Sequence, residues 1–185
     1  MSILTAPASD AVAQAQAYTA ALFATLGSRD PLEVLRTTPA ELRRAAADLS
    51  PQELSTPEAP GKWSVRELLQ HLADSELVGS FRFRMVLAHD RPMLPGYDQD
   101  LWADRLRYQD ADVAASLGDF ESLRRANLRL LERASPADLQ RVMRHQERGD
   151  ESLGHMMRMY AGHDLVHLRQ LARIREAVRP GQAAG

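Results

Sequence analysis

Two histidines near the end of the chain, His163 and His167 in the stretch GHDLVHLRQL, stand four residues apart. On a helix this spacing places both imidazoles on one face, one turn apart. Imidazole nitrogen is a common ligand of divalent transition metals. The spacing therefore predicts either part of a metal site or two hydrogen-bonded histidines, and alone it favours neither.

The surrounding apolar residues indicate which face the pair occupies. Leucine, methionine, tyrosine, isoleucine and valine continue the same line at steps of three and four: Leu153, Met156 and Tyr160 before the pair, and Leu171, Ile174 and Val178 after it. The histidines thus stand where the core of a helical bundle would have aliphatic residues. Two buried imidazoles without partners are costly, which favours a common ligand.

A third histidine could complete such a site. His71 lies in VRELLQHLADSE beside the apolar line of Val65, Leu68 and Leu72, so its ring can point into the bundle. The other histidines are weaker candidates, expected to be ordinary surface residues, although one of them could border the site. These are His89, His145 and His155, of which His145 is the one that could border it.

The zincin motif His-Glu-x-x-His is a poor match to the same stretch. Asp164 stands in the position of the glutamate, and no histidine follows His167. A zincin helix needs the longer carboxylate as its general base. We therefore expect Asp164 to face solvent or to flank the helix.

Helix-start signals recur along the chain and define the elements that carry these residues. Four residues have the side chain of an N-cap and are followed by proline at the first helical position and an acid at the third: Asp30, Thr38, Ser50 and Ser135. Ser64 and Glu67 form a capping box at a fifth helix start. Apolar periodicity predicts helices at about 31–49 (bent at Pro39), 65–89, 111–134 and 151–178, with an alanine-rich helix at 9–26.

No segment alternates with period two over enough residues to indicate a strand. The expected fold is all-α, a four-helix bundle over 29–180 with an N-terminal helical extension over 1–28 and a tail at 181–185. The long connection at 90–110 contains prolines and aromatic residues. It is expected either to cover a pocket or to pack its own aromatic side chains.

Composition excludes several classes of function. The 185 residues carry a formal net charge of −2 with no basic block, which argues against nucleic acid or an anionic membrane as partner. No signal peptide or membrane span is visible, so a cytoplasmic protein acting on a small molecule is expected. Cysteine is absent, so thiol chemistry would require a thiol supplied from outside the chain.

Three stretches together resemble one family. GKWSVRELLQHLADSE, RFRMVLAHDRPMLPGYDQDLWA and HDLVHLRQL are similar to the DinB-like (YfiT-like) superfamily over roughly residues 30–178. The resemblance implies a four-helix bundle, a homodimer, and a divalent metal, zinc or nickel, held by His71, His163 and His167. Some members resemble transferases that join a low-molecular-weight thiol such as bacillithiol or mycothiol to an electrophile in detoxification, and others resemble metal-dependent hydrolases.

Three neutral imidazoles would leave at least one ligand position of a metal open, as in catalytic sites. A thiol there would lose its proton near neutral pH, and water there would supply hydroxide for hydrolysis. The ligands cannot decide between these reactions. Three functions stay open: a thiol transferase, a hydrolase, and a non-enzymatic bundle that binds a metal or another ligand.

Residues that would face the substrate give weaker signals. Arg82 lies about three helical turns after His71 on nearly the same face. It could bind a carboxylate of a thiol cofactor, although a salt bridge within the bundle is the favoured interpretation. Asn127 could support a ligand histidine, or simply have its hydrogen bonds satisfied. Glu76 is expected on the helix surface or behind a ligand, and Tyr160 in the core.

Overall fold

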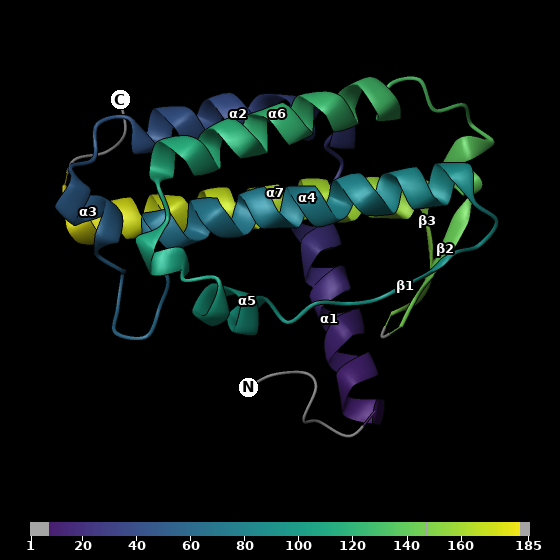
Figure 1. The fold of residues 1–185 in the computed structure, drawn as a ribbon, viewed down its shortest axis with the longest axis horizontal. Helices are drawn as coiled ribbons and strands as arrows, with labels where there is room; N and C mark the ends of the chain where they lie inside the picture. Colours follow the sequence, from purple (N-terminus) through teal and green to yellow (C-terminus); the bar gives the residue numbers. More distant parts are fainter. Residues whose placement is uncertain (1–7, 147, 182–185) are drawn as a thin grey trace.

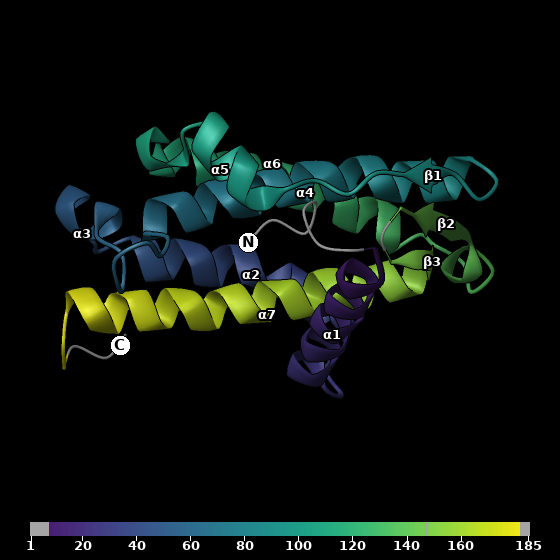
Figure 2. The ribbon, with the colours of Figure 1, turned by 90° about the horizontal axis from the view of Figure 1, so that it is seen from below.

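Four long helices form the body of the protein. The computed structural model describes residues 8–146 and 148–181, without the side chains of 8–14. In Figures 1 and 2, two of the helices lie side by side over the other two, and all four follow the long axis of the molecule. These helices are α2 (Pro31–Ala46), α4 (Val65–Ala88), α6 (Val113–Leu131) and α7 (Leu153–Val178). The predicted all-α, four-helix-bundle architecture is confirmed.

Capping side chains explain where these helices begin. Ser64 accepts a hydrogen bond from the backbone N–H of Glu67, whose carboxylate accepts one from the backbone of Ser64. Such reciprocal bonds satisfy two of the N–H groups that the first turn leaves free. Asp30 and Asp112 are the N-caps of α2 and α6, where their side chains accept hydrogen bonds from backbone N–H groups of the first turn. Another capping box, at Ser50, begins the short helix α3 (Pro51–Ser55).

Helix α2 continues through Pro39, where the sequence predicts a bend. Proline has no backbone N–H, so the carbonyl oxygen of Leu35, four residues earlier, receives no hydrogen bond from it. Nη1 of Arg124 in α6 donates to that oxygen over 3.0 Å. The acceptor that the proline leaves free therefore serves a contact between two helices.

A small sheet closes one end of the bundle, contrary to the expectation of no strands. Strands β2 (Val142–His145) and β3 (Gly149–Ser152) form an antiparallel hairpin, and β1 (Met93–Leu94) runs parallel to β2. Each strand has at most four residues, and VMRH and GDES do not alternate between apolar and polar types. Too little sequence was available for the period-two signal to appear.

The rest of the long connections is also structured. Helix α5 (Gln99–Arg105) and the 3₁₀ turn η2 (Tyr108–Asp110) occupy the 90–110 connection beside α4, and η3 (Asp138–Gln140) precedes the hairpin. In Figure 1, the chain after α4 turns back along the bundle through β1 to α5. This segment therefore covers one side of α4.

The interior of the bundle has two apolar clusters with a polar layer between them. One cluster lies at the end near the sheet and the other at the end near α3. On α7 the first cluster ends at Ala161 and the second begins at Leu171. The polar layer contains side chains that are at most 9% exposed, from α4, α6 and α7: His71, Ser75, Glu76, Ser80, Arg124, Asn127, His163, Asp164 and His167.

Helix α1 (Ala8–Leu26) lies outside the bundle and packs across α7, as Figure 2 shows. The two backbones come so close that a Cβ atom on Gly162 would lie 2.5 Å from the carbonyl oxygen of Leu22. Glycine is therefore required at this crossing. Apart from Gly181, the tail predicted at 181–185 lies outside the described residues, as do residues 1–7 of the N-terminal extension. None of the described helices is long and apolar enough to cross a membrane.

Candidate metal centre

Three imidazole rings meet in the polar layer. Nε2 of His163 lies 3.2 Å from Nε2 of His71 and 3.0 Å from Nε2 of His167. One ring nitrogen from each of the three histidines lies within 4.8 Å of the others. His71 is fully buried, and the other two rings are 9% and 8% exposed. The structure thus brings together the three histidines that the sequence selects.

Regular helix geometry produces this meeting. His163 and His167 lie one turn apart on α7, and His71 lies on α4 between the buried residues Leu68 and Leu72. Side chains at positions i and i+4 share a helix face, so the two histidines of α7 present their rings to the same point on α4. The indole of Trp63, just before α4, lies against the His71 ring with centroids 4.8 Å apart.

Burial keeps these imidazoles neutral. Removal from water lowers the pKa of His167 to about 4. The same cause lowers the pKa of His71 and of His163 well below the ordinary value, and neighbouring histidines add to the effect. Near neutral pH each ring therefore keeps a nitrogen lone pair available as a ligand.

The donor set fits a divalent cation better than it fits hydrogen bonds alone. Nε2 of His163 has either one proton or one lone pair, so it cannot bond well to both of its neighbours. Nitrogen ligands of tetrahedral zinc, at bond lengths of about 2.0–2.1 Å, are separated by about 3.3 Å. The observed separations of 3.2 and 3.0 Å are close to that value.

The outer nitrogens of two rings have different environments. Nδ1 of His167 lies 2.9 Å from Oε1 of Gln170. An amide oxygen only accepts, so the proton of His167 is on Nδ1 and its Nε2 lone pair faces the other histidines. Nδ1 of His71 is buried and has no hydrogen-bond partner among the described residues. Sequence reasoning missed Gln170, although its position three residues after His167 would place it on the same face.

A buried ion network lies in the same layer. The guanidinium of Arg124 in α6 donates to Glu76 of α4 over 3.0 and 2.9 Å and to Asp164 of α7 over 2.5 and 3.1 Å. With the bond to Leu35, all five N–H groups of the guanidinium have acceptors. The three side chains are at most 2% exposed. This network ties together the two helices that carry the histidines.

The charges of the network depend on each other. Burial opposes the charged form of Arg124, but Asp164 and Glu76 raise its pKa above the ordinary value. Burial raises the pKa of Asp164, and Arg124 limits the rise. The expectation that Asp164 faces solvent or flanks the helix is therefore wrong, because Arg124 on a third helix supplies its counter-charge. Of the two alternatives for Glu76, the helix surface is wrong for the same reason, and a place behind a ligand stays a prediction.

Asn127 extends this network and does not contact a histidine. Its Nδ2 donates to Glu76 and to the hydroxyl of Ser80, each over 2.7 Å, and its Oδ1 accepts from Arg84 over 3.0 Å. The hydrogen bonds of this buried amide are thus satisfied within α4 and α6.

Comparison of the sequence with known proteins identifies the family of this chain. The model of the DinB superfamily matches residues 34–171, a span that includes all three histidines and the whole ion network. The chain belongs to the DinB superfamily.

Relatives of this superfamily member point to metal dependence. A Bacillus mycoides protein named "Putative metal-dependent hydrolase" is 31% identical over 145 residues, which are 78% of this chain and 83% of the relative. A protein with the same description from Oceanobacillus iheyensis is 32% identical over 133 residues, which are 72% of this chain and 77% of the relative. These names and the three-histidine cluster together support metal binding.

A solved structure supports the fold. YfiT from Bacillus subtilis, described as "a probable metal-dependent hydrolase with an unusual four-helix bundle topology", superposes with a TM-score of 0.75 at 26% identity. The match covers 79% of this chain and 84% of YfiT. The resemblance to the DinB-like, YfiT-like superfamily predicted from the sequence is confirmed.

In this DinB protein, Arg82 is buried on α4 and contacts the small sheet. Its Nη2 donates to the carbonyl oxygen of Pro95 over 2.7 Å and lies 3.4 Å from Nε2 of His145. None of the ion pairs between described residues includes Arg82, so the salt bridge that we favoured is not found there. His145, expected at the surface, is 1% exposed because β2 turns its ring toward α4.

The remaining candidates have structural contacts. Tyr160 packs its ring on Phe83, with centroids 5.1 Å apart, and is half-buried at the edge of the apolar cluster, so the predicted core position is only partly confirmed. His155, expected to be an ordinary surface residue, is instead half-buried, because α1 packs on α7 and places Phe23 against its ring at 4.9 Å between centroids. His89 is exposed at the C-terminal end of α4, as expected.

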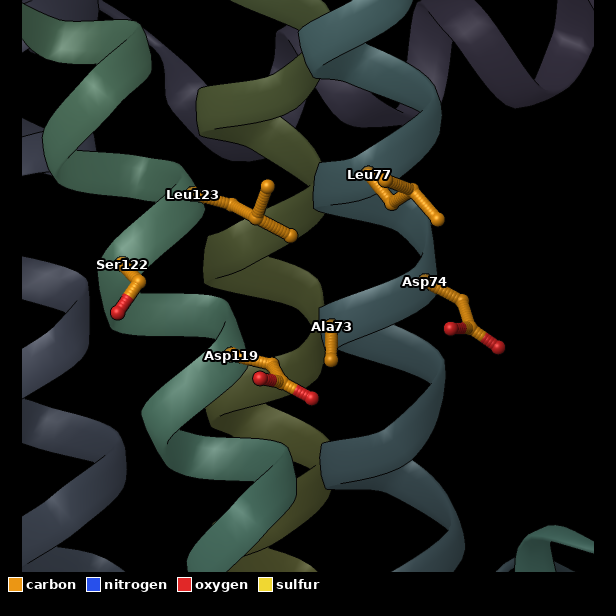
Figure 3. A pocket seen from close by; sticks show the side chains of 6 residues that line it. All are labelled: Ala73, Asp74, Leu77, Asp119, Ser122 and Leu123. Carbon is orange, nitrogen blue, oxygen red and sulfur yellow. The ribbon is translucent and has the colours of Figure 1, made fainter.

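A separate cleft lies on the outer side of α4. It has a volume of about 330 Å³, lies between α4 and α6, and none of the three histidines lines it. Figure 3 shows the Asp119 side chain directed from α6 toward Ala73 of α4, while Asp74 and Leu77 point away from the gap between the helices. Asp74 accepts a hydrogen bond from the phenol of Tyr108 over 2.6 Å. We assign no chemistry to this cleft.

Proposed function

We propose that His71, His163 and His167 hold a divalent transition metal, zinc or nickel. We further propose that the protein is an enzyme that transfers a low-molecular-weight thiol of the bacillithiol type to an electrophile. The observation that carries the proposal is the convergence of three neutral, buried imidazole nitrogens. When bound, such a cation lowers the pKa of a thiol or water molecule beside the histidines.

The ion network favours a thiol over water as the nucleophile. Attack by water is usually assisted by a general base, and carboxylates are common in that role. Glu76 and Asp164 are both engaged by Arg124, so neither is placed to accept a proton. A thiol, with an ordinary pKa of about 8.5, needs less assistance than water. The chain has no cysteine, so that thiol would come from a substrate.

Hydrolysis of a small molecule is the second candidate, favoured by the descriptions of YfiT and of the Bacillus mycoides relative. The same three imidazoles would serve it, with water in place of the thiol. The roles of the protein's own residues differ little between the two reactions. In both, Gln170 orients His167, and the Arg124 network fixes α4 against α7.

Two measurements test the proposal in sequence. Metal content by elemental mass spectrometry should be about one equivalent in the wild type, and near zero in His71→Ala and His163→Ala. His89→Ala, at an exposed helix end, is the matched control and should keep the metal. Equal metal content in all four proteins would overturn the ligand assignment.

Turnover of the loaded protein then separates the reactions. Consumption of monobromobimane that depends on added thiol, above the uncatalysed rate, supports the transferase. Cleavage of p-nitrophenyl acetate without thiol supports the hydrolase. Metal binding without either reaction would indicate a protein that binds the metal and does not catalyse these reactions.

A further inference from the structure

Arg82 differs from the other strongly buried arginine in how its charge is balanced. Arg124 is 2% exposed and contacts two carboxylates. Arg82 is 7% exposed, and the partners of its guanidinium are a backbone carbonyl and an imidazole. None of the described carboxylates lies within ion-pair distance of it. A buried cation without a counter-charge is costly.

The imidazole does not supply that counter-charge. Burial, with the nearby charges of Arg148 and Arg82, lowers the pKa of His145 to about 4, so the ring is neutral near pH 7. Arg148 itself forms an ion pair with Glu151, and those two charges cancel. Among the described groups around this guanidinium, the charges of Arg148 and Glu151 cancel and His145 is neutral, so the buried charge of Arg82 has no counter-charge there.

Two phenols lie beside this charge. Tyr97 follows by two residues Pro95, whose carbonyl oxygen accepts from Arg82. The Tyr160 ring packs on α4 at Gly79, one turn before Arg82. Burial raises the pKa of both phenols, and the positive charge of Arg82 partly offsets each rise, which agrees with this placement. Both phenols are only half-buried, although the guanidinium is almost covered. A neutral phenol can donate a hydrogen bond to an anion.

Tyr160 also connects this region to the three histidines. It precedes His163 by one turn of α7, and its hydroxyl lies 3.4 Å from the carbonyl oxygen of Ser75, one turn after His71 on α4. Its ring crosses α4 at Gly79, where a Cβ atom would lie 2.7–2.9 Å from the ring and hydroxyl atoms. Glycine at this position thus allows the phenol to lie between the histidines and Arg82.

We propose that Arg82, with the phenols of Tyr97 and Tyr160, binds a carboxylate group of the substrate. The proposal rests on the function proposed above, because it takes the three histidines as the place of reaction. One carboxylate balances the single positive charge, and the planar guanidinium suits its two oxygens. The backbones of Arg82 and His71 are about 16 Å apart along α4, and long helical side chains lean toward the N-terminus, so the Arg82 side chain spans part of that distance. The substrate class is therefore an elongated acid whose reacting group is separated from its carboxylate by a chain of several atoms.

The first experiment tests the carboxylate site without metal. The melting temperature of the metal-free protein is measured with hexanoate, with inorganic phosphate and with chloride at equal ionic strength. We expect hexanoate to raise it in the wild type and in Arg125→Gln, which removes an exposed arginine of α6, but not in Arg82→Gln. Equal protection of Arg82→Gln, or protection by phosphate alone, would overturn the proposal.

The second experiment joins the two sites. Calorimetry on the zinc-loaded protein compares ω-mercapto acids of six and eight carbons with ω-mercapto alcohols of the same lengths. At one length or both, the wild type should bind the acid at least about tenfold more tightly than the alcohol. Arg82→Gln should lose that preference and bind the alcohols as before. A preference that survives in Arg82→Gln would overturn the assignment of Arg82.

The two proposals fail in different ways. If no mercapto compound binds the zinc-loaded protein, the thiol function falls, while protection by hexanoate that needs Arg82 still supports the carboxylate site. If the alcohols and acids bind equally well to the wild type, the carboxylate site falls and the thiol function stands. Circular dichroism and the melting temperature without ligand show that each variant is folded.

Discussion

Two groups of buried polar side chains share one layer of the bundle, and they differ in how completely their hydrogen bonds are formed. In the network of Glu76, Arg124 and Asp164, every N–H of the guanidinium has an acceptor. In the three-histidine cluster, ring nitrogens of the same kind face one another at 3.0–3.2 Å. Complementary charges hold a fold together, whereas converging acceptors indicate a ligand that all of them share.

Replacing Arg124 by methionine should have the largest effect on stability. The change leaves Glu76 and Asp164 buried without their counter-charge, and breaking a buried ion pair in this way costs about 3–5 kcal/mol. The measurement is the free energy of unfolding of the metal-free protein in urea. Arg125→Met, one residue away and exposed, should change it by less than about 0.5 kcal/mol. A loss below about 1 kcal/mol in Arg124→Met would contradict the structural role of the network.

His163→Ala should show the reverse pattern, with a large loss of metal and a smaller loss of stability. Nε2 of His163 lies between those of the other two histidines, so its removal breaks the donor set. We expect the dissociation constant for zinc to rise more than about 100-fold, beyond the effect typical of residues behind the ligands. Its free energy of unfolding without metal should fall less than that of Arg124→Met. If His163→Ala unfolds as easily as Arg124→Met and still binds zinc, the distinction between a ligand role for His163 and a structural role for Arg124 is contradicted.

Gln170→Ala should weaken the metal site without removing a ligand. His167 would lose the acceptor that keeps the proton on Nδ1, and such changes typically cost about 10–100-fold in metal affinity. Competition with a chelator of known affinity measures the effect. Gln170→Glu keeps an acceptor oxygen and should recover most of the affinity. Identical dissociation constants for wild type and Gln170→Ala would show that the hydrogen bond does not orient the ring.

The smallest effect concerns pH. In the metal-free folded protein the pKa of His167 is about 4, below its ordinary value of 6.5, because the ring is buried. Between these values the unfolded chain binds more protons, so the free energy of unfolding falls as the pH falls from about 6.5 toward 4. His167→Gln should flatten this dependence by about 1 kcal/mol per pH unit. Urea unfolding at pH 7, 6 and 5 measures the slope, and equal slopes in both proteins would contradict the assignment.

The bundle and the three histidines could be predicted because both depend on local periodicity. Ser64 and Asp30 mark helix starts by their own side-chain chemistry, and the positions of His163 and His167 on a helix face follow from the helical repeat. His71 was selected by its place beside the apolar line of Val65, Leu68 and Leu72, and the resemblance to a family implied that it shares one site with the other two. The homodimer implied by that resemblance stays a prediction.

The errors have different causes, and the largest concern partners that are distant in sequence. Asp164 and Glu76 are 40 and 48 residues from Arg124, and spacing along one helix does not show which neighbouring helix supplies a counter-charge. The hairpin of β2 and β3 was missed because backbone pairing holds it with little apolar alternation. Gln170 was missed because a polar residue beside an imidazole is recognised only when the ring orientation is known.

The distance in sequence between the histidines also sets the order of events when the protein is made. His71 and His163 are 92 residues apart, and α7, with two of the three histidines, is the last of the described helices. Because synthesis proceeds toward the C-terminus, α4 emerges from the ribosome long before α7. An incomplete chain presents isolated imidazoles that hold a metal only weakly. If the three histidines hold a metal as proposed, tight capture requires α7, so the ion can contribute to the bundle only after this last described helix has been made.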